Sequence, residues 1–346
     1  MKKLAILGAG SWGLTLAWLA CLRDPAETGA PAPSECQIVL WDRTAAKIEA
    51  IKKNRAITFP VNVTLSNTLE LTASLAEAVQ DADVVLLAVT SNGTREVARQ
   101  LKASGALSKN CILVNCSKGI EFSTLKRISQ VLDEEVPENR NAVLSGPALA
   151  KEILAGLPTA CAVAAKDAET AEYLQHHLGH ERLLRLYSNT DVTGVELGGS
   201  LKNVFAIPSG YMQAKKLGDN AQASLITRGL AEMTRFSVAL GAKPETLYGL
   251  SGLGDLLATC NSPLSRNYQV GARLAQGETL ENILSDLKVV AEGVKTTYAV
   301  LELAKQLGID MPIVEVVKRS LSEKISEKDI IKSLMSRKLK PEQVKE

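Results

Sequence analysis

The stretch KLAILGAGSWG, residues 3–13, decides the fold of the first half of the chain. Residues 3–7 are an apolar run that predicts a buried strand, and an apolar helical segment follows from Ser11 to Leu22. Between them Gly8, Gly10 and Gly13 have the spacing G-x-G-x-x-G, which is typical of a dinucleotide-binding turn. We expect these glycines to permit a tight turn, close approach of a pyrophosphate, and packing of the helix on the strand, respectively.

Strands and helices alternate through the rest of the first half. We expect further strands at 37–41, 83–89, 111–115, 142–144, 160–165 and 183–187, and helices at 71–81, 94–102, 123–133 and 168–178. Residues 24–36 are rich in Pro, Gly and Ala and predict a surface loop. This alternation predicts a doubly wound, mostly parallel α/β sheet of the Rossmann type, with helices on both faces.

Ligands of such sheets bind beyond the carboxyl ends of the strands. Four polar or glycine-rich groups fall at predicted strand ends, at residues 8–13, 90–92, 117–119 and 145–147. Lys118 is a candidate site residue because a lysine just past an apolar strand can meet a phosphate or a carbonyl group. The alternative is an ordinary loop lysine.

The second strand ends in Asp42 and Arg43. An acid at this place normally binds the ribose hydroxyls of NAD, whereas an arginine beside it can hold the 2′-phosphate of NADP. Because both occur in succession, the choice between NAD(H) and NADP(H) stays open. The alternative is that the pair is simply a solvated strand end that binds no cofactor.

After residue 190 the predicted segments become long and helical. We expect helices at 193–207, 219–240, 265–275, 278–287, 293–307, 313–324 and 327–337, and then a charged, frayed tail at 338–346. The chain of 346 residues therefore divides into a dinucleotide-binding domain, residues 1–190, and an all-helical substrate domain, residues 191–346.

A lysine lies within the apolar helix that opens the second half. The stretch GVELGGSLKN, residues 194–203, places apolar side chains all round the helix, so we expect the helix to be buried. Gly198 and Gly199 stand one turn before Lys202, and each costs on the order of 1 kcal/mol inside a helix. We interpret them as room for a ligand against the backbone. The alternative is a helix crossing with the lysine reaching solvent.

Three loops of the helical half place polar groups in apolar surroundings. Asp255 lies in the glycine-rich turn 250–256, and Glu292 separates two helices. Ser265 is expected to cap a helix whose free N–H groups form an anion site together with Arg266. The alternatives are plain capping by Asp255 and Glu292 and a surface position for Arg266.

The composition excludes several classes of function. With 40 Lys and Arg against 38 Asp and Glu, and no dense basic block before the tail, we expect no nucleic-acid binding by phosphate neutralisation. No apolar run approaches the roughly 18 residues of a spanning helix, so we expect no membrane insertion. The apolar N-terminal run holds the glycine motif and leads to Arg23, which does not fit a signal peptide.

Cysteine and histidine usage gives two further expectations. Six scattered cysteines without a C-x-x-C pair predict reduced thiols and a cytoplasmic protein. His176, His177 and His180 lie in a polar helix end without neighbouring cysteines or carboxylates, so we predict surface histidines and no metal site. The apolar helical half is compatible with a homodimer.

Seven motifs, in this order, resemble those of the bacterial NAD(P)-dependent glycerol-3-phosphate dehydrogenase family over nearly the whole chain. They are GAGSWG (8–13), SKGIE (117–121), LSGPALAKE (144–152), GVELGGSLKN (194–203), DNAQASLITRGLAEM (219–233), GLSGLGDLLATCNSPLSRN (249–267) and VVAEGVKTT (289–297). Several motifs are ten residues or longer, so the resemblance is far more specific than the glycine motif alone.

The resemblance implies interconversion of sn-glycerol 3-phosphate and dihydroxyacetone phosphate with NAD(H) or NADP(H), and a product that feeds phospholipid synthesis. It implies that Lys202 is the general acid and base. It implies a substrate site formed by Lys118, Gly146, Ala148, Lys202, Asp255, Ser265, Arg266 and Asn267. It implies a cofactor site formed by Gly8, Gly10, Ser11, Trp12, Gly13, Arg43, Lys118, Ala150, Arg266, Val290 and Glu292.

Elementary chemistry agrees with these roles. Hydride transfer to a ketone needs a proton donor at the developing alkoxide. A lysine desolvated in an apolar helix has a lowered pKa, which suits Lys202 to that task near neutral pH. Arg266 at a helix N-terminus would anchor the substrate phosphate away from the reacting carbon.

The sequence departs from the family pattern in three places. Thr90 stands where the family usually has Pro, and Ala148 replaces a hydroxyl residue, which removes one side-chain contact from the site. The loop 24–36 is longer than usual. Two other interpretations stay open: a dehydrogenase of a hydroxy acid or sugar acid, and a nicotinamide-sensing regulator that would not need Lys202, Asp255 and Arg266 together.

Overall fold

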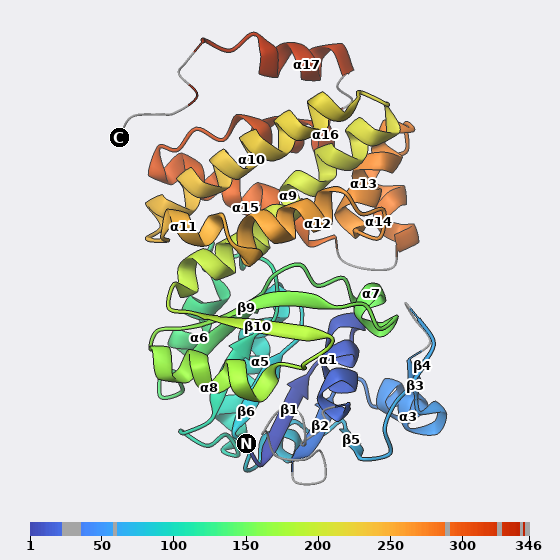
Figure 1. The fold of residues 1–346 in the computed structure, drawn as a ribbon, viewed down its shortest axis with the longest axis vertical. Helices are drawn as coiled ribbons and strands as arrows, with labels where there is room; N and C mark the ends of the chain where they lie inside the picture. Colours follow the sequence, from blue (N-terminus) through green and yellow to red (C-terminus); the bar gives the residue numbers. More distant parts are fainter. Residues whose placement is uncertain (23–35, 58–60, 288–290, 324–326, 340–341, 343–346) are drawn as a thin grey trace.

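The computed structural model describes residues 1–22, 36–57, 61–287, 291–323, 327–339 and 342. In Figure 1 a sheet with its covering helices fills the lower half of the view, and a second, helical part fills the upper half. The predicted loop at 24–36, apart from Cys36, and most of the predicted tail at 338–346 lie outside the described residues.

The first half of the chain forms an eight-stranded sheet in the order β10-β9-β8-β7-β6-β1-β2-β5. All neighbouring strands run parallel except β8 and β9, which are antiparallel. The predicted doubly wound, mostly parallel sheet is therefore confirmed. The strands are β1 (Lys3–Leu7), β2 (Gln37–Trp41), β5 (Leu69–Thr72), β6 (Val84–Leu87), β7 (Ile112–Asn115), β8 (Asn141–Ser145), β9 (Thr159–Ala165) and β10 (Leu184–Asn189), with a separate small pair of β3 (Ala56–Ile57) and β4 (Val63–Thr64).

Helices cover both faces of the sheet, which is why its central strands are apolar along their whole length. Leu4 and Ile6 of β1 face one core, which is shared with α1, α3, α7 and α8, whereas Ala5 and Leu7 face the other, which is shared with α4, α5 and α6. The helices are α1 (Ser11–Cys21), α3 (Ala45–Asn54), α4 (Leu75–Val79), α5 (Thr94–Ser104), α6 (Ile128–Glu135), α7 (Ala150–Leu154) and α8 (Ala168–Leu178).

Two predicted helices of this half are partly wrong. The segment 71–81 begins inside β5, and α4 starts only after Ser74, whose side chain accepts a hydrogen bond from the Glu77 N–H. The helix predicted at 123–133 starts at Ile128, because the chain before it makes a turn in which Leu125 has φ of 59°. A left-handed residue of this kind interrupts a right-handed helix.

The second half is helical, as predicted, and α9 lies at its centre, in contact with α10, α12, α13 and α15. The start of α9 also packs on the sheet, where Val192 and Val195 meet Val143 of β8. The helices are α9 (Val192–Ala214), α10 (Asp219–Ala239), α11 (Pro244–Leu247), α12 (Asp255–Cys260), α13 (Arg266–Ala275), α14 (Leu280–Leu287), α15 (Glu292–Leu307), α16 (Pro312–Ser322) and α17 (Glu327–Met335). The helix α9 packs in the core of the helical half and also on the sheet. The division of the chain into two domains after residue 190 therefore stays a prediction.

The helix α9 is longer than the predicted segment 193–207, since it continues through Pro208. Gly210 and Gly271 let α13 approach closely: a Cβ on either glycine would lie within 2.0 Å of a carbonyl oxygen of the other helix. This packing holds the helix together across the proline, which lacks an N–H. Among the described residues, every helix is too short or too polar to span a membrane.

Candidate active site

The glycine motif forms a tight turn between β1 and α1. Gly8 has φ of 112°, and a Cβ on Gly13 would lie 1.8 Å from the Gly8 carbonyl oxygen, so both positions require glycine. A Cβ on Gly10 would meet no atom within 4 Å, and α1 starts next to it without a side-chain cap. The first N–H groups of α1, at Ser11 and Trp12, therefore border open space that fits a pyrophosphate.

The acid at the end of β2 is already engaged within the protein. Asp42 Oδ2 accepts hydrogen bonds from the Ala9 N–H at 3.0 Å and from Lys47 Nζ at 2.9 Å, and Oδ1 accepts from the Thr44 N–H at 3.0 Å. Burial raises the pKa of Asp42, but the hydrogen bonds from Lys47, Thr44 and Ala9 outweigh it and hold this pKa below its ordinary value. Arg43 beside it is exposed.

Two lysines share one buried carboxylate where the sheet meets the helical half. Lys202 Nζ on α9 donates to Asp255 Oδ1 at 2.9 Å, and Lys118 Nζ, just after β7, donates to Asp255 Oδ2 at 2.6 Å. Lys202 also donates to Thr259 Oγ1 at 2.6 Å, and Lys118 to the Gly146 carbonyl at 2.7 Å. The structure thus brings together Lys118, Gly146, Lys202 and Asp255, all four of which the sequence analysis assigned to the substrate site.

The surroundings of Lys202 change its proton affinity. Its side chain is 9% exposed, and burial lowers the pKa of Lys202 below its ordinary value. Asp255 opposes this effect, whereas the positive charge of Lys118 adds to it. Lys202 is therefore buried rather than directed to solvent, and its lowered pKa makes the ammonium form a stronger proton donor.

The position of Asp255 differs from the predicted turn at 250–256. Residues Leu250–Gly254 form a π-helical turn, and Asp255 is the first residue of α12. A Cβ on Gly252 would lie 2.0 Å from the Leu247 carbonyl oxygen, so the tight turn depends on this glycine. Since the Asp255 oxygens bind two lysines, the carboxylate is not a plain helix cap.

The interpretation of Gly198 and Gly199 as room for a ligand is wrong. A Cβ on Gly198 would lie 2.6 Å from the Ser251 carbonyl oxygen, and a Cβ on Gly199 would lie 2.1 Å from Ser145 Oγ. Both glycines instead let protein approach α9: the π-helical turn on one side and the end of β8 on the other. They therefore bring Asp255 and the sheet within reach of Lys202.

Side-chain amides connect the helix ends around this cluster. Asn203 Nδ2 donates to the Lys118 carbonyl at 3.2 Å, and Asn267 Nδ2 donates to Asn203 Oδ1 at 3.0 Å. Asn267 Oδ1 accepts from the Gly293 N–H at 3.1 Å. Ser265 caps α13 by accepting from the Tyr268 N–H, as predicted. The N-termini of α13 and α15 therefore meet beside Lys202.

Two charged residues occupy these N-termini. Arg266 opens α13 and is partly buried rather than on the surface; burial lowers its pKa, which the nearby Glu292 opposes. Glu292 opens α15, and its Oε1 accepts from the Ser91 N–H at 3.3 Å. Burial raises the pKa of Glu292, against the effects of Ser91 and Arg266. Among the described residues, no hydrogen bond or ion pair is recorded for the Arg266 side chain.

Gly146, Ala148 and Ala150 lie around the end of β8. Gly146 has φ of 151° and packs so closely that a Cβ would lie 2.7 Å from Cys161 Cα. Ala148 packs on the core under α1, and Ala150 begins α7, which contacts α1. Val290 lies outside the described residues.

Sequence reasoning missed Thr259 and Asn203, and it named Ser145 only as part of the group at the end of a predicted strand. Thr259 lies one helical turn after Asp255, so the i, i+4 spacing from the acid was the available signal. Within the part of the chain that the structure describes, Ser145 Oγ, buried under Gly199, has no hydrogen-bond partner, and nothing in the sequence indicated this. Within the described residues, no three His, Cys, Asp or Glu side chains group as metal ligands.

The sheet with its open glycine turn and the buried lysine cluster define a dinucleotide-dependent oxidoreductase with a helical second half. Two family profiles match the chain: the NAD-dependent glycerol-3-phosphate dehydrogenase N-terminus over residues 3–171, and its C-terminus over residues 191–332. The chain belongs to the NAD-dependent glycerol-3-phosphate dehydrogenase family.

Individual relatives agree with the family match. The glycerol-3-phosphate dehydrogenase [NAD(P)+] of Thermobifida fusca is 44% identical over 346 residues, which cover 99% of both chains. That of Streptomyces coelicolor is 43% identical and covers 98% of both. The crystal structure of glycerol-3-phosphate dehydrogenase from Coxiella burnetii aligns with a TM-score of 0.87 at 33% identity, covering 97% of this chain and 99% of that one.

Proposed function

We propose that the chain interconverts dihydroxyacetone phosphate and sn-glycerol 3-phosphate, with Lys202 as the proton-transfer group. The observation that carries this proposal is the Lys202 amine, buried at the junction of the sheet and the helical half and bonded to Asp255 and Thr259. The names of the relatives support the choice of substrate. They favour this reaction over a hydroxy-acid dehydrogenase or a nicotinamide-sensing regulator.

The residues at the glycine turn fit NAD(H) or NADP(H). The open side of Gly10 and the free N–H groups of Ser11 and Trp12 would hold the pyrophosphate, and Arg43 would lie at the adenosine end. Ala150, Val290 and Glu292 are proposed as further contacts. The bound cofactor supplies or accepts the hydride.

The proton is handled by Lys202. During reduction its Nζ donates a proton to the carbonyl oxygen of the substrate, and during oxidation it takes that proton back. Asp255 holds the ammonium form through Oδ1 and holds Lys118 through Oδ2, so the two amines face the substrate at a fixed separation. Lys118 then stabilises the negative charge that develops on the same oxygen.

The substrate phosphate is assigned to the N-terminus of α13. Arg266, the free N–H groups of this helix and Asn267 form a positive end next to Lys202. Ser265 holds the first turn in place, and Gly146 and Ala148, at the end of β8, are proposed as further substrate contacts. Binding energy at the phosphate, remote from the reacting carbon, then aligns the carbonyl with Lys202.

The proposal has four further parts: the roles of the two domains, the use of the product, the cellular location and the oligomeric state. Residues 1–190 would bind the cofactor and residues 191–346 the substrate, and the product would supply phospholipid synthesis. A cytoplasmic location is supported by the six scattered cysteines, which form no C-x-x-C pair. A homodimer is supported by exposed apolar side chains on the helical half, such as Val238 and Tyr248, and light scattering of the purified chain tests it.

The test is the oxidation rate of NADH and of NADPH with dihydroxyacetone phosphate, followed by the absorbance of the reduced nicotinamide. We expect turnover with this ketone and at least about 100-fold lower kcat/KM with dihydroxyacetone, which lacks the phosphate. Equal rates with α-keto acids would refute the proposal. No oxidation with any ketone would favour the regulator.

A further inference from the structure

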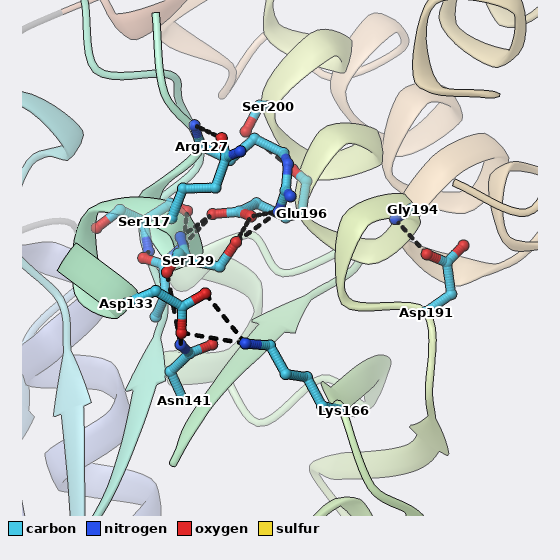
Figure 2. A network of polar contacts seen from close by, with 12 residues as sticks. Ser117, Arg127, Ser129, Asp133, Asn141, Lys166, Asp191, Gly194, Glu196 and Ser200 are labelled. Carbon is cyan, nitrogen blue, oxygen red and sulfur yellow. Dashed lines mark hydrogen bonds and ion pairs between the residues drawn. The ribbon is translucent and has the colours of Figure 1, made fainter. Parts of the chain in front are cut away.

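A second buried carboxylate lies on α9, one and a half turns before Lys202. The Glu196 side chain is 1% exposed and points from α9 toward the ends of β7 and α6, as Figure 2 shows. Burial of a carboxylate is costly unless hydrogen bonds replace its water. The proposed reaction gives this residue no role.

Each of the two carboxylate oxygens of Glu196 accepts two hydrogen bonds from residues of the sheet half. Oε1 accepts from the Ser129 N–H at 2.9 Å and from Asn115 Nδ2 at 3.3 Å. Oε2 accepts from Ser129 Oγ at 2.6 Å and from Arg127 Nη1 at 3.0 Å. Glu196 therefore caps the N-terminus of α6, although it belongs to a helix 67 positions later in the sequence.

The same contacts lead to the loop that carries Lys118. Asn115, whose amide donates to Glu196, also donates to the Ser117 carbonyl at 3.3 Å, and its Oδ1 accepts from the Ser117 N–H at 2.9 Å. Further along α9, the Ser200 hydroxyl shares its proton between the Glu196 carbonyl at 2.9 Å and the Gly119 carbonyl at 3.3 Å. Asn203 Nδ2 donates to the Lys118 carbonyl at 3.2 Å. One face of α9 thus binds the loop 117–119 on both sides of Lys118.

We propose that Glu196 is a positioning residue that fixes the start of α9 against β7 and α6 and thereby holds Lys202 and Lys118 on the two oxygens of Asp255. This inference rests on the proposed function of Lys202. A helix bound at Glu196 cannot slide or rotate relative to the loop 117–119. Since a misplacement of about 1 Å in a site can cost about 100-fold in rate, this anchoring acts on catalysis through distance.

The decisive variant is Glu196→Gln, which keeps the shape but replaces one acceptor oxygen with an amide donor facing Arg127 or Ser129. We expect kcat to fall about 10- to 100-fold while the Kd of the reduced cofactor stays within about twofold, because the glycine turn follows β1, which β6 separates from β7. The structural control is Glu232→Gln. Glu232 is also a buried carboxylate that caps a helix, through the N–H groups of Ile313 and Val314, but it serves α16.

A readout that stability alone would not move is the proton affinity of Lys202. The titratable groups around its amine are Asp255 and Cys260 on α12, Lys118 after β7, Cys161 on β9 and Glu292 at the start of α15. Loosening this cluster admits water, so the pKa of Lys202 rises and the kcat limb of glycerol 3-phosphate oxidation moves to higher pH in Glu196→Gln. NMR of 13C-labelled lysine, assigned with Lys202→Met, measures the same pKa without any turnover, so it tests positioning even if the proposed reaction fails.

Asn115→Ala tests the same series of contacts at Asn115. It removes the hydrogen bonds that connect Glu196 with Ser117 but leaves the hydrogen bonds from Glu196 to the N-terminus of α6. We expect a similarly lowered kcat and a similar shift of the kcat limb of glycerol 3-phosphate oxidation to higher pH. The proposal is overturned if Glu196→Gln keeps wild-type kcat, or if Glu196→Gln and Glu232→Gln lower kcat equally with the Lys202 pKa unmoved. A lowered kcat together with a raised Lys202 pKa in Glu196→Gln, with neither change in Glu232→Gln, supports it.

Discussion

The two ends of the candidate site are built by different means. At the cofactor end a turn of consecutive residues, 8–13, presents backbone N–H groups to open space, and Asp42 braces the turn through the Ala9 N–H. At the catalytic end Lys202 and Lys118 meet on Asp255 from sequence separations of 53 and 137 positions. The first end therefore depends on local backbone shape, whereas the second depends on how the two halves of the chain pack.

Removing the amine at the catalytic end should have the largest effect. We expect Lys202→Ala to lower kcat at least about 100-fold, because it removes the amine assigned to proton transfer. Cofactor binding, measured by nicotinamide fluorescence, should stay near wild type, since the glycine turn is untouched. Lys166→Ala, which removes an exposed lysine paired with Asp133, is the control.

Removing the charge at the start of α13 should act mainly on substrate binding. We expect Arg266→Ala to raise the KM for dihydroxyacetone phosphate roughly 30-fold, as a lost charge-assisted contact to phosphate does. Activity on dihydroxyacetone should change far less. Arg273→Ala, on the same helix but bonded to Glu278 and Asp286, should leave both values unchanged; equal losses on the two ketones in Arg266→Ala would contradict the assignment.

At the cofactor end, two glycine substitutions should separate fold from binding. Gly10→Ala places a methyl group in open space, so we expect a folded protein whose Kd for NAD(P)H rises about tenfold or more. Gly13→Ala places its methyl 1.8 Å from the Gly8 carbonyl oxygen and should unfold the turn. Thermal unfolding with and without cofactor measures both; an unchanged Kd in Gly10→Ala would remove the pyrophosphate from this place.

This comparison also explains what the sequence could predict. The glycine turn, the parallel sheet and the helical second half followed from local patterns, and the helix at 168–178 has the predicted bounds. Motif order brought Lys118, Lys202 and Asp255 into one site. Each of these signals is local or is carried by the family resemblance.

The errors arose where tertiary packing decides. Gly198 and Gly199 indicated a close approach, but periodicity does not say that Ser251 and Ser145 are what approach. The helix α9 runs through Pro208 because α13 packs on it, although the proline alone predicts an end. Hydrogen bonds such as those of Thr259 and Glu196 depend on segments that only the fold brings together.

The smallest effect should distinguish the two nicotinamide cofactors. Lys47, on the first turn of α3, is 43% exposed and neutralises Asp42, whose oxygens would otherwise face the ribose. Lys47→Met should therefore remove one of the two hydrogen bonds to Asp42 Oδ2, which leaves this oxygen able to accept from the 2′-hydroxyl of NADH, and remove a cation that attracts the 2′-phosphate of NADPH. We expect the ratio of kcat/KM for NADPH over NADH to fall about 3- to 10-fold, a modest change because the pair is partly exposed to solvent.

Lys52→Met is the matched control for this variant, since Lys52 is equally exposed on the same helix but pairs with Glu49. If both variants move the ratio alike, the effect is general surface charge rather than release of Asp42. If Lys47→Met leaves the ratio unchanged while Arg43→Met lowers it, the arginine alone reads the 2′-phosphate. If Lys47→Met alone lowers the ratio, the cofactor end resembles the catalytic end in one respect: a carboxylate paired with a lysine decides which charge the site accepts.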